Sequence, residues 1–505
     1  MKIAGSILCK FRCYFPGKAK NASSQIQRFT TAVAPASNIL RYYGQPAPHT
    51  HPHLFKKDEV TPGLEKLEYR LRRELLMKRI MDSGLGRTFP DMDHLVVFTS
   101  APKLYMSIDV PYFYRQNTEF LYMSGFIEAD SVLLLHSQKK LGSGFEEVMF
   151  VTQRNASKEL WEGPSAGVEG GRDLLGIQNV KPLDHLDRYL ANYLKDSNKF
   201  CLWYEYLKPV NQKIHSNSFL PLMKEANRVE TPTKIVHHQR LMKSTAEIEL
   251  MRKSNRIASE AFVEVMKFTK PWINESALFA KMDFECRIHG AEYLAYPPVV
   301  AGGNRANTIH YISNNQVIAD GELVLMDAGC EYHGYCSDIT RTWPVTGNFS
   351  PAQRDLYSAC LIIQELCIQM CRPGVTLEEI YRAMLAIMGE QLKKLGLIPS
   401  SVSASDVIKL TRQFCAHHVG HYLGMDVHDS AEVGRNLALQ PGMIITIEPG
   451  IYISATRNDV DPKYRGIGIR IEDNILITET GHENLTANCP KDPDVIEQII
   501  TDGKS

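Results

Sequence analysis

The sequence predicts two folded domains, an α/β domain followed by one of mixed α/β and α+β character. Its 505 residues are too many for one ordinary hydrophobic core. Hydrophobic residues make up 44% of the chain, so sizeable cores are available. Segments with helical periodicity alternate with short apolar runs typical of strands. We place the first domain at residues 56–235 and the second at 236–505.

The first domain shows one strong helical pattern early and several strand patterns after it. Residues from Leu64 to about Ser83 are charged and rich in leucine at helical spacing, and residues 183–194 are similar. The expected strands are residues 94–99, 120–126, 131–135 and 148–151. This alternation predicts an α/β fold over about residues 65–230.

The second domain begins after a segment rich in lysine and threonine, residues 230–245, which we interpret as a linker. Residues 246–266 then carry apolar side chains at helical spacing, with acidic residues early, which predicts a long helix. Further helices are expected at residues 354–371 and 376–396. Between them lie apolar strands that contain isolated acidic residues.

The N-terminus is basic and lacks acidic residues before Asp58. Together with its serine and threonine content, this predicts a mitochondrial transit peptide, which with a proline- and histidine-rich linker would occupy residues 1–55. The alternative is a disordered basic tail without a targeting role. A form without the presequence would be cytosolic, whereas the full chain is expected in mitochondria, in the matrix.

Composition excludes several classes of function. Lys+Arg and Asp+Glu both number 57, so nothing in the charge indicates a nucleic acid partner. No uninterrupted apolar run is long enough to span a bilayer. The 11 cysteines are scattered without a CxxC pair, which argues against a disulfide scaffold or a thiolate zinc site.

Four acidic residues lie in strand-like apolar sequence. Asp327 and Asp338 flank a turn, and a hairpin centred between Tyr332 and His333 would place them directly opposite each other. Glu448 and Glu472 lie in similar apolar runs. Carboxylates crowded in an apolar setting repel unless they are protonated or bind cations. Four carboxylates would balance two divalent cations, of which Mn²⁺ suits oxygen ligands best, with Co²⁺ or Zn²⁺ as alternatives.

Histidines accompany these acids. Four lie within twelve positions: His417, His418, His421 and His428. His310 lies in the sequence Thr308-Ile-His-Tyr. A single histidine in an apolar strand is commonly a core residue, but this density beside four apolar-strand acids favours a metal and catalytic role. Neutral imidazole binds metals, and its cationic form can stabilise an oxyanion.

The acids and His421 occur in five local sequences: Met326-Asp-Ala-Gly, Ser337-Asp-Ile-Thr-Arg-Thr, Gly420-His-Tyr-Leu-Gly, Ile447-Glu-Pro-Gly-Ile-Tyr and Arg470-Ile-Glu-Asp. In these motifs and their order the chain resembles the aminopeptidase P family, within the creatinase and methionine aminopeptidase superfamily. The resemblance extends over roughly residues 60–490. It implies a creatinase-like N-terminal α/β domain followed by a pita-bread catalytic domain.

The resemblance also implies the metal ligands. Asp338 and Glu472 would bridge two metal ions, Asp327 would bind one, and His421 and Glu448 would bind the other. A hydroxide bridging the metals would act as the nucleophile, and Glu448 would shuttle its proton.

Other residues receive roles in substrate binding and catalysis from the same resemblance. His428 would hold the scissile carbonyl oxygen, while His310 and His417 would line the cleft. His417 is preferred over His418 because it lies four residues before His421. Arg470 would orient Glu472 or its neighbours. Tyr296 would form part of the wall against the substrate's proline ring.

The implied function is release of the N-terminal residue from peptides with proline at position two. A prolidase limited to dipeptides shares the ligands, and cleavage of longer peptides would distinguish the two. A methionine aminopeptidase needs no creatinase-like domain. A binding or scaffold protein on the same fold would not need all five ligands. The resemblance further implies a homodimer.

Overall fold

The computed structural model describes residues 42–83, 92–138, 144–197 and 199–503. Most of the expected transit peptide, residues 1–41, therefore lies outside the described residues. The described part of the expected linker packs against the N-terminal domain, since Tyr43, Ala47 and Phe55 are buried in its core or beside it. Gln45 Oε1 also accepts a hydrogen bond from the backbone of Ile127 at 2.9 Å. This segment thus packs on the surface and core edge of the N-terminal domain.

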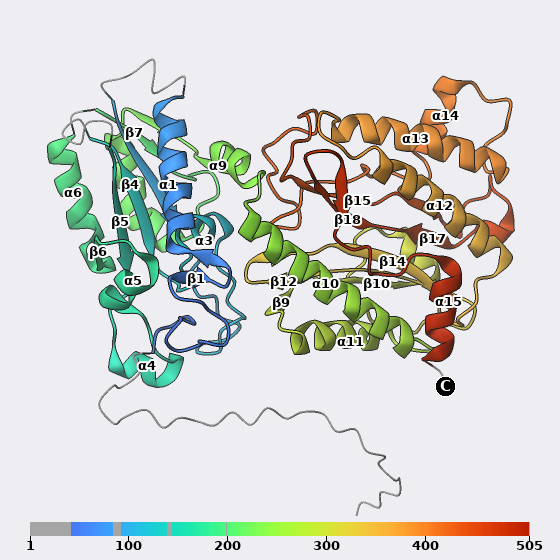
Figure 1. Cartoon of the computed structure of the whole chain (residues 1–505), viewed down its shortest axis with the longest axis horizontal. Coiled ribbons are helices and arrows are strands. Elements are labelled where there is room, and N and C mark those ends of the chain that lie inside the picture. The colour runs from blue at the N-terminus through green and yellow to red at the C-terminus, as the bar shows by residue number, and fades with distance from the viewer. Residues whose placement is uncertain (1–41, 84–91, 139–143, 198, 504–505) are drawn as a thin grey trace, which may run out of the picture. The chain divides into compact units, whose positions relative to one another are not determined.

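A six-stranded mixed sheet organises the N-terminal domain, with the order β6-β5-β4-β3-β7-β8 (Figure 1). Its strands are β3 (Asp93–Thr99), β4 (Val132–His136), β5 (Glu146–Val151), β6 (Val180–Pro182), β7 (Phe200–Trp203) and β8 (Arg228–Glu230). β4 runs antiparallel to both β3 and β5, while the β5–β6, β3–β7 and β7–β8 pairs are parallel. A small hairpin of β1 (Glu59–Thr61) and β2 (Leu64–Glu65) precedes the first helix.

Helices cover both faces of this sheet. Val96 and Phe98 share a core cluster with α1 (Lys66–Met81) and α5 (Gly167–Leu175), whereas Leu95 and Val97 pack with α6 (Leu186–Asp196) and α8 (Leu220–Glu225). This division follows from the two-residue period of a strand, which sends successive side chains to opposite faces. The described part of this region also contains α3 (Thr118–Ser124), α4 (Ala156–Glu162) and the short α7 (Gln212–Ile214).

Sequence-based expectations for this domain are mostly confirmed, with two exceptions. Of the expected strand at residues 120–126, residues 120–124 lie in helix α3 (Thr118–Ser124) and the last two follow its end. Asn117 caps this helix, because its Oδ1 accepts a hydrogen bond from Phe120 N at 3.0 Å, and Gly125 ends it with φ of 70°. The cap and the glycine outweigh the aromatic content that indicated a strand. The expected linker at 230–245 is also helical, as α9 (Thr233–Arg240).

The second domain combines long helices with small antiparallel sheets (Figure 1). Its helices are α10 (Thr245–Phe268), α11 (Glu275–Ile288), α12 (Pro351–Gln369), α13 (Leu377–Lys394), α14 (Ala404–Thr411) and α15 (Pro493–Asp502). Its sheets have the orders β10-β11-β14, β13-β12-β9, β15-β18-β19 and β16-β17. Capping boxes at Ser244, Ser350 and Thr376 start α10, α12 and α13.

Asp327 lies in a strand of this second domain, and Asp338, Glu448 and Glu472 lie in links directly beside the ends of its strands. The strands are β9 (Tyr293–Leu294), β10 (Val299–Gly302), β11 (Leu323–Ala328), β12 (Cys330–Tyr332), β13 (Tyr335–Cys336), β14 (Ile339–Pro344), β15 (Ile444–Ile447), β16 (Gly450–Ile453), β17 (Ile467–Arg470), β18 (Asp473–Ile477) and β19 (His482–Asn484). One large core cluster joins their inner faces to α10, α12 and α13.

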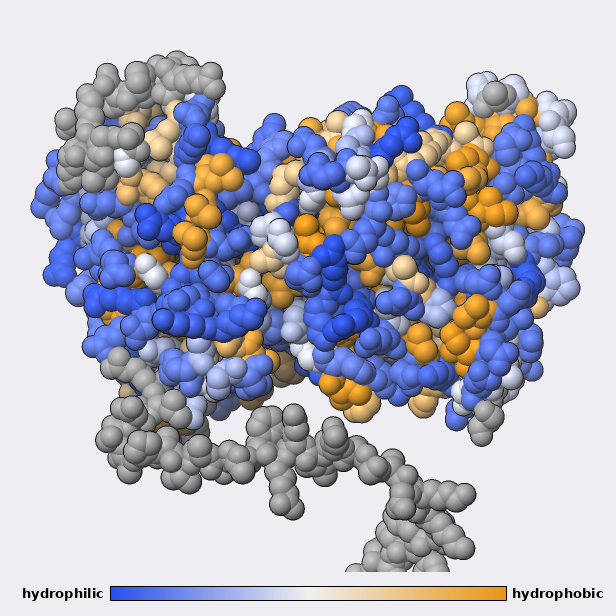
Figure 2. Space-filling model, in the orientation of Figure 1, coloured by the Kyte–Doolittle hydropathy of each residue, from blue (hydrophilic) through white to orange (hydrophobic). Residues whose placement is uncertain are grey.

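The surface mixes polar and apolar side chains on the face shown in Figure 2. Among the residues that the structure describes, no helix is both long and apolar enough to cross a membrane. The nine described cysteines are all buried and free of disulfides.

Candidate active site

Asp327 and Asp338 lie on the same face of one hairpin but are not directly opposite. Asp327 is the register partner of Thr340, and Ala328 pairs with Ile339. The hairpin is therefore centred between His333 and Gly334, one position later than the sequence indicated, and that expectation was wrong. The positive φ angles of His333 (49°) and Gly334 (84°) fix the turn there. Asp338 becomes a diagonal neighbour of Asp327.

Glu448, Glu472 and His421 converge on the two aspartates. His421 Nε2 lies 3.4 Å from Asp338 Oδ2 and 3.6 Å from Glu448 Oε1. Ligand atoms of Asp338, His421 and Glu472 lie within 4.8 Å of one another, close enough to share a metal ion. The backbone of His421 donates to Thr446 Oγ1 at 3.1 Å, which ties the histidine to strand β15.

The electrostatics of this cluster fit a bound cation. Burial raises the pKa of Asp327. It also raises the pKa of Glu448 to about 7, and burial followed by the charge of Asp338 holds the pKa of Glu472 well above its usual value. Burial alone would lower the pKa of His421, but Asp338 and Glu448 raise it to about 9. Carboxylates so placed become stable as anions when divalent cations offset their repulsion.

Tyr296 approaches the same carboxylates. Its hydroxyl lies 2.5 Å from Asp327 Oδ1 and 2.5 Å from Asp338 Oδ1. Sequence reasoning assigned Tyr296 to the wall against the proline ring and did not indicate this contact. The structure shows a hydroxyl that orients the two aspartates, and the contact with substrate stays a prediction.

Arg470 links several of these residues. Its Nη2 lies 2.6 Å from Asp327 Oδ2, and its Nε donates to Thr340 Oγ1 at 3.0 Å. Thr340 Oγ1 in turn donates to Glu472 Oε2 at 2.7 Å. Arg470 thus contacts Asp327 directly and reaches Glu472 through Thr340. Its Nη1 also donates to the Tyr452 hydroxyl at 2.9 Å.

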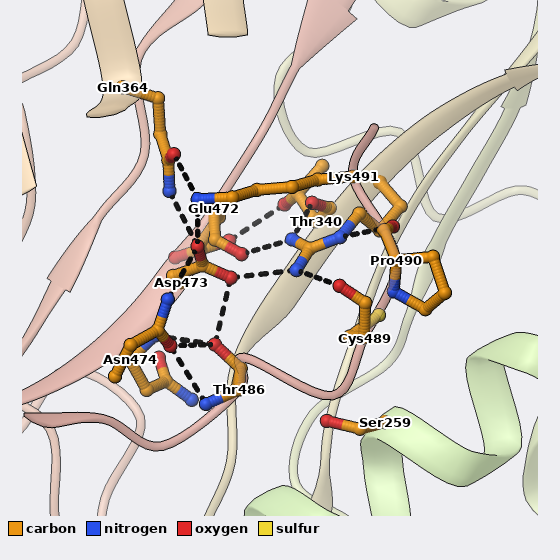
Figure 3. A network of polar contacts seen from close by, with 12 residues as sticks. Ser259, Thr340, Gln364, Glu472, Asp473, Asn474, Thr486, Cys489, Pro490 and Lys491 are labelled. Carbon is orange, nitrogen blue, oxygen red and sulfur yellow. Dashed lines mark hydrogen bonds and ion pairs between the residues drawn. The ribbon is translucent and has the colours of Figure 1, made fainter. Parts of the chain in front are cut away.

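A second polar network holds Glu472 from behind (Figure 3). Asp473 points away from the metal cluster, where its carboxylate meets Arg341 at 2.7 Å, Gln364 at 2.8 Å and Lys491 at 2.9 Å. Arg341 also donates to the backbone carbonyl of Glu472 at 2.5 Å. Because Asp473 and Arg341 are fully buried, this network fixes the backbone from which Glu472 projects.

A cleft of about 660 Å³ opens beside the cluster. All five histidines singled out from the sequence line it: His310, His417, His418, His421 and His428. The rings of His421 and His428 meet edge to face, with centroids 4.5 Å apart. Glu448 and Arg435 lie along the same cleft, whereas the other three carboxylates do not line it.

The two adjacent histidines, His417 and His418, have different surroundings. His417 Nε2 lies 2.9 Å from the Tyr452 hydroxyl, which connects it to Arg470. His418 stacks on Tyr381 of α13, with ring centroids 4.4 Å apart, and its Nε2 lies 3.6 Å from Glu378. His417 is therefore linked through Tyr452 to Arg470, whereas His418 packs against a helix.

We expect His417→Ala to reduce peptidase turnover much more than His418→Ala. Both histidines line the cleft, but loss of His417 also removes the contact with Tyr452, whereas loss of His418 removes a stacking contact with Tyr381. Steady-state kinetics of both purified variants would measure this. A larger loss of kcat in His418→Ala, with equal thermal stability, would show that the roles of the two residues are reversed.

Sequence reasoning missed Tyr452, Thr340 and Asp473. Gly450 pairs with Arg470, and Tyr452 lies two residues further along β16, on the same face. This two-residue period is the signal by which Tyr452 could have been found. Thr340 follows Asp338 by the same period. Asp473 gave no comparable signal, since an acid adjacent to a predicted ligand could equally face solvent.

Comparisons with known proteins agree with this architecture. The description "Metallopeptidase family M24" matches residues 249–479, and "Aminopeptidase P, N-terminal domain" matches residues 69–203. The human protein named Xaa-Pro aminopeptidase 3 is 47% identical over 94% of this chain and 94% of its own length. The Arabidopsis thaliana protein named Intermediate cleaving peptidase 55, mitochondrial, is 37% identical over 95% and 93% respectively.

A solved structure of similar form is the zinc-substituted Escherichia coli aminopeptidase P in complex with product. It has a TM-score of 0.80 and 33% identity, covering 88% of this chain and 99% of the bacterial one. The fold and the carboxylate and histidine cluster therefore define a two-domain metallopeptidase with a pita-bread catalytic domain and a site for two divalent metal ions. The chain belongs to the aminopeptidase P family.

Proposed function

We propose that this chain is an Xaa-Pro aminopeptidase, a metallo-exopeptidase that releases the first residue of peptides with proline at position two. The observation that supports this most is the convergence of Asp338, His421 and Glu472 within 4.8 Å beside a histidine-lined cleft. Relatives that match nearly the full length of the chain carry the name Xaa-Pro aminopeptidase.

The ligand assignment we propose has five residues: Asp327, Asp338, His421, Glu448 and Glu472. Their donor set of four carboxylates and one imidazole suits two hard or borderline divalent cations, and we propose Mn²⁺ as the native metal. When bound, such ions polarise the scissile carbonyl and lower the pKa of a coordinated water.

The side chains around the cluster would perform the remaining chemistry. We assign proton transfer to Glu448 Oε2, because Oε1 already faces Thr446 and His421 at 3.4 and 3.6 Å. We assign stabilisation of the carbonyl oxygen to His428, which is exposed to the cleft beside His421. A donor placed at a developing oxyanion lowers the barrier because the charge appears only in the transition state.

The proposed preference for proline depends on the scissile bond, which has no amide N–H when the second residue of the substrate is proline. Proline makes that bond a tertiary amide, so an enzyme that needs the amide donor handles it poorly. We propose that the site replaces this donor with ring contacts from the cleft and histidines on the carbonyl. The free amino group would lie near the Asp327 metal, which would limit cleavage to one residue.

Hydrolysis of tripeptides against dipeptides tests this function and separates it from that of a prolidase. We expect the purified protein to release residue one from Xaa-Pro-Yaa, to lose activity after chelation, and to regain it with added Mn²⁺. Chromatography of the products would measure the release of residue one under each of these conditions. Cleavage restricted to Xaa-Pro dipeptides would instead identify a prolidase, and equal activity after complete metal removal would exclude the proposed chemistry.

Three further proposals follow from the sequence and the relatives. We propose a mitochondrial location, testable by fusing residues 1–55 to a reporter. We propose a homodimer, testable by sedimentation of the purified chain. We propose domain limits at 56–235 and 236–505, testable by mapping the sites of limited proteolysis.

A further inference from the structure

The loop that carries His428 has an unusual number of buried charged contacts. It runs from Gly424 to Glu432 between the metal ligand His421 and strand β15. Asp429 and Ser430 are almost fully buried, although His428 beside them is exposed to the cleft. None of these buried charges belongs to the proposed metal site, so their placement calls for another role.

Helix α9 supplies the first set of contacts to this loop. Arg240 Nη2 lies 2.5 Å from Asp429 Oδ1 and 2.8 Å from Asp426 Oδ2, so one guanidinium holds both aspartates. Lys243 Nζ, just past the helix, lies 3.6 Å from Asp429 Oδ2. Arg240, Lys243 and Asp429 are each at most 6% exposed, where charge-assisted hydrogen bonds are strong and loss of one partner is costly.

The loop backbone is strained where it follows these residues. Ser430 has φ of 52°, a left-handed conformation that a non-glycine residue adopts at a cost. Its N–H donates to Asp429 Oδ1 at 2.9 Å, and its hydroxyl donates to the backbone carbonyl of His237 in α9 at 3.1 Å. Gly424 allows the arrangement, since a Cβ there would lie 2.0 Å from Asp429 Oδ2.

The N-terminal domain supplies the second set of contacts. Thr118 Oγ1, at the start of α3, donates to Asp426 Oδ1 at 2.7 Å. Arg115 Nη2 donates to the Met425 carbonyl at 3.0 Å, while its Nε holds Glu331 at 2.7 Å. The loop is therefore fixed between α9 and a part of the chain about three hundred residues earlier in sequence.

We propose that Asp426 and Asp429, held by Arg240 and by Thr118 of the N-terminal domain, are positioning residues for His428. They would keep the imidazole over the metal site, so that the N-terminal domain contributes to the catalytic step. If these contacts served only stability, they could lie anywhere along the domain contact. They meet instead at Asp426 and Asp429, the two aspartates that flank the cleft residue His428. This inference rests on the proposed function, because it concerns His428 acting on a substrate carbonyl.

Thr118→Val and Asp426→Ala test the proposal. Each removes the 2.7 Å contact between the N-terminal domain and the loop without touching His428 or a proposed metal ligand. We expect kcat on an Xaa-Pro-Yaa peptide to fall by about 10- to 10²-fold, because small displacements of a catalytic group are costly. KM and metal content should stay near the wild-type values. Thr118→Ser, which keeps the hydroxyl, should restore kcat.

A matched control is Tyr335→Phe. It deletes another buried hydroxyl at the contact between the two domains, one that accepts a hydrogen bond from Arg72 of α1 at 3.3 Å and donates to Glu247 of α10 at 2.8 Å, and neither partner belongs to the loop. We expect normal kcat in this variant. An equal loss of kcat in Tyr335→Phe would show that general loosening of the domain contact, and not the loop, is responsible, and would overturn the proposal.

A double variant tests whether Asp426 acts through His428. If it does, Asp426→Ala combined with His428→Ala should lose no more kcat than His428→Ala alone, because coupled residues are not additive. Losses that multiply would overturn the proposal, as would full kcat in both single variants.

Amide hydrogen exchange supplies a readout independent of activity. We expect peptides covering residues 422–430 to exchange faster in Thr118→Val and Asp426→Ala, with α12 unchanged. Unchanged exchange in the loop would overturn the proposal. An inactive wild type would instead count against the proposed function, and the exchange measurement would still decide whether these contacts position the loop.

Discussion

Replacing Asp338 by asparagine is expected to remove at least one metal ion and nearly all peptidase activity. Asp338 Oδ2 lies 3.4 Å from His421 Nε2. Candidate ligand atoms of Asp338, His421 and Glu472 all lie within 4.8 Å of one another. Asparagine keeps the shape but removes the negative charge that a proposed bridging ligand supplies to both cations. The hydrogen bond and charge of His421 outweigh burial and lower the pKa of Asp338, so wild type has a carboxylate here.

Metal content per chain and kcat on an Xaa-Pro-Yaa peptide would be measured together. Asp130→Asn is a suitable control, because Asp130 lies in the N-terminal domain and pairs with Asn211 at 3.1 Å, away from the cluster. We expect the control to keep both metals and normal turnover. If Asp338→Asn also kept both, the assignment of two metal ions to this cluster would be wrong.

Replacing His428 by alanine is expected to lower kcat by about 10²- to 10³-fold, the usual cost of losing one oxyanion donor. Metal content should stay near normal, since His428 faces the cleft beside His421 and is not one of the proposed ligands. Burial is the main cause that lowers the pKa of His428, so its neutral form would donate one N–H to the oxygen.

His289→Ala is the control for the His428 variant. It removes an exposed histidine at the end of α11, outside the cleft, and should leave kcat unchanged. Loss of metal from His428→Ala would place His428 among the ligands. Unchanged kcat in His428→Ala would remove it from the catalytic step.

Much of the site could be predicted because its strands are apolar. Acids in such strands stand out, since burial of an unpaired carboxylate is costly and indicates a partner. The same reasoning failed for the register of Asp327 and Asp338. The turn residue His333 adopts a positive φ angle, which glycine and not histidine usually signals, so the true centre was shifted by one position.

Other features depend on contacts distant in sequence. Tyr452 contacts His417 and Tyr381 stacks on His418, and these two tyrosines, which distinguish the two histidines, lie in separate elements. The polar threonine and lysine content of helix α9 predicts a linker, yet Arg240 is buried against two aspartates almost two hundred residues away. No local pattern indicates such a pairing.

The most direct test of the account is a comparison of three peptides on the metal-loaded protein: Xaa-Pro-Yaa, Xaa-Ala-Yaa and the acetylated form of Xaa-Pro-Yaa. We expect release of residue one from the first, little release from the second and none from the third. Comparable rates on the proline and alanine peptides would contradict proline selectivity. Efficient cleavage of the acetylated peptide would contradict the aminopeptidase assignment itself.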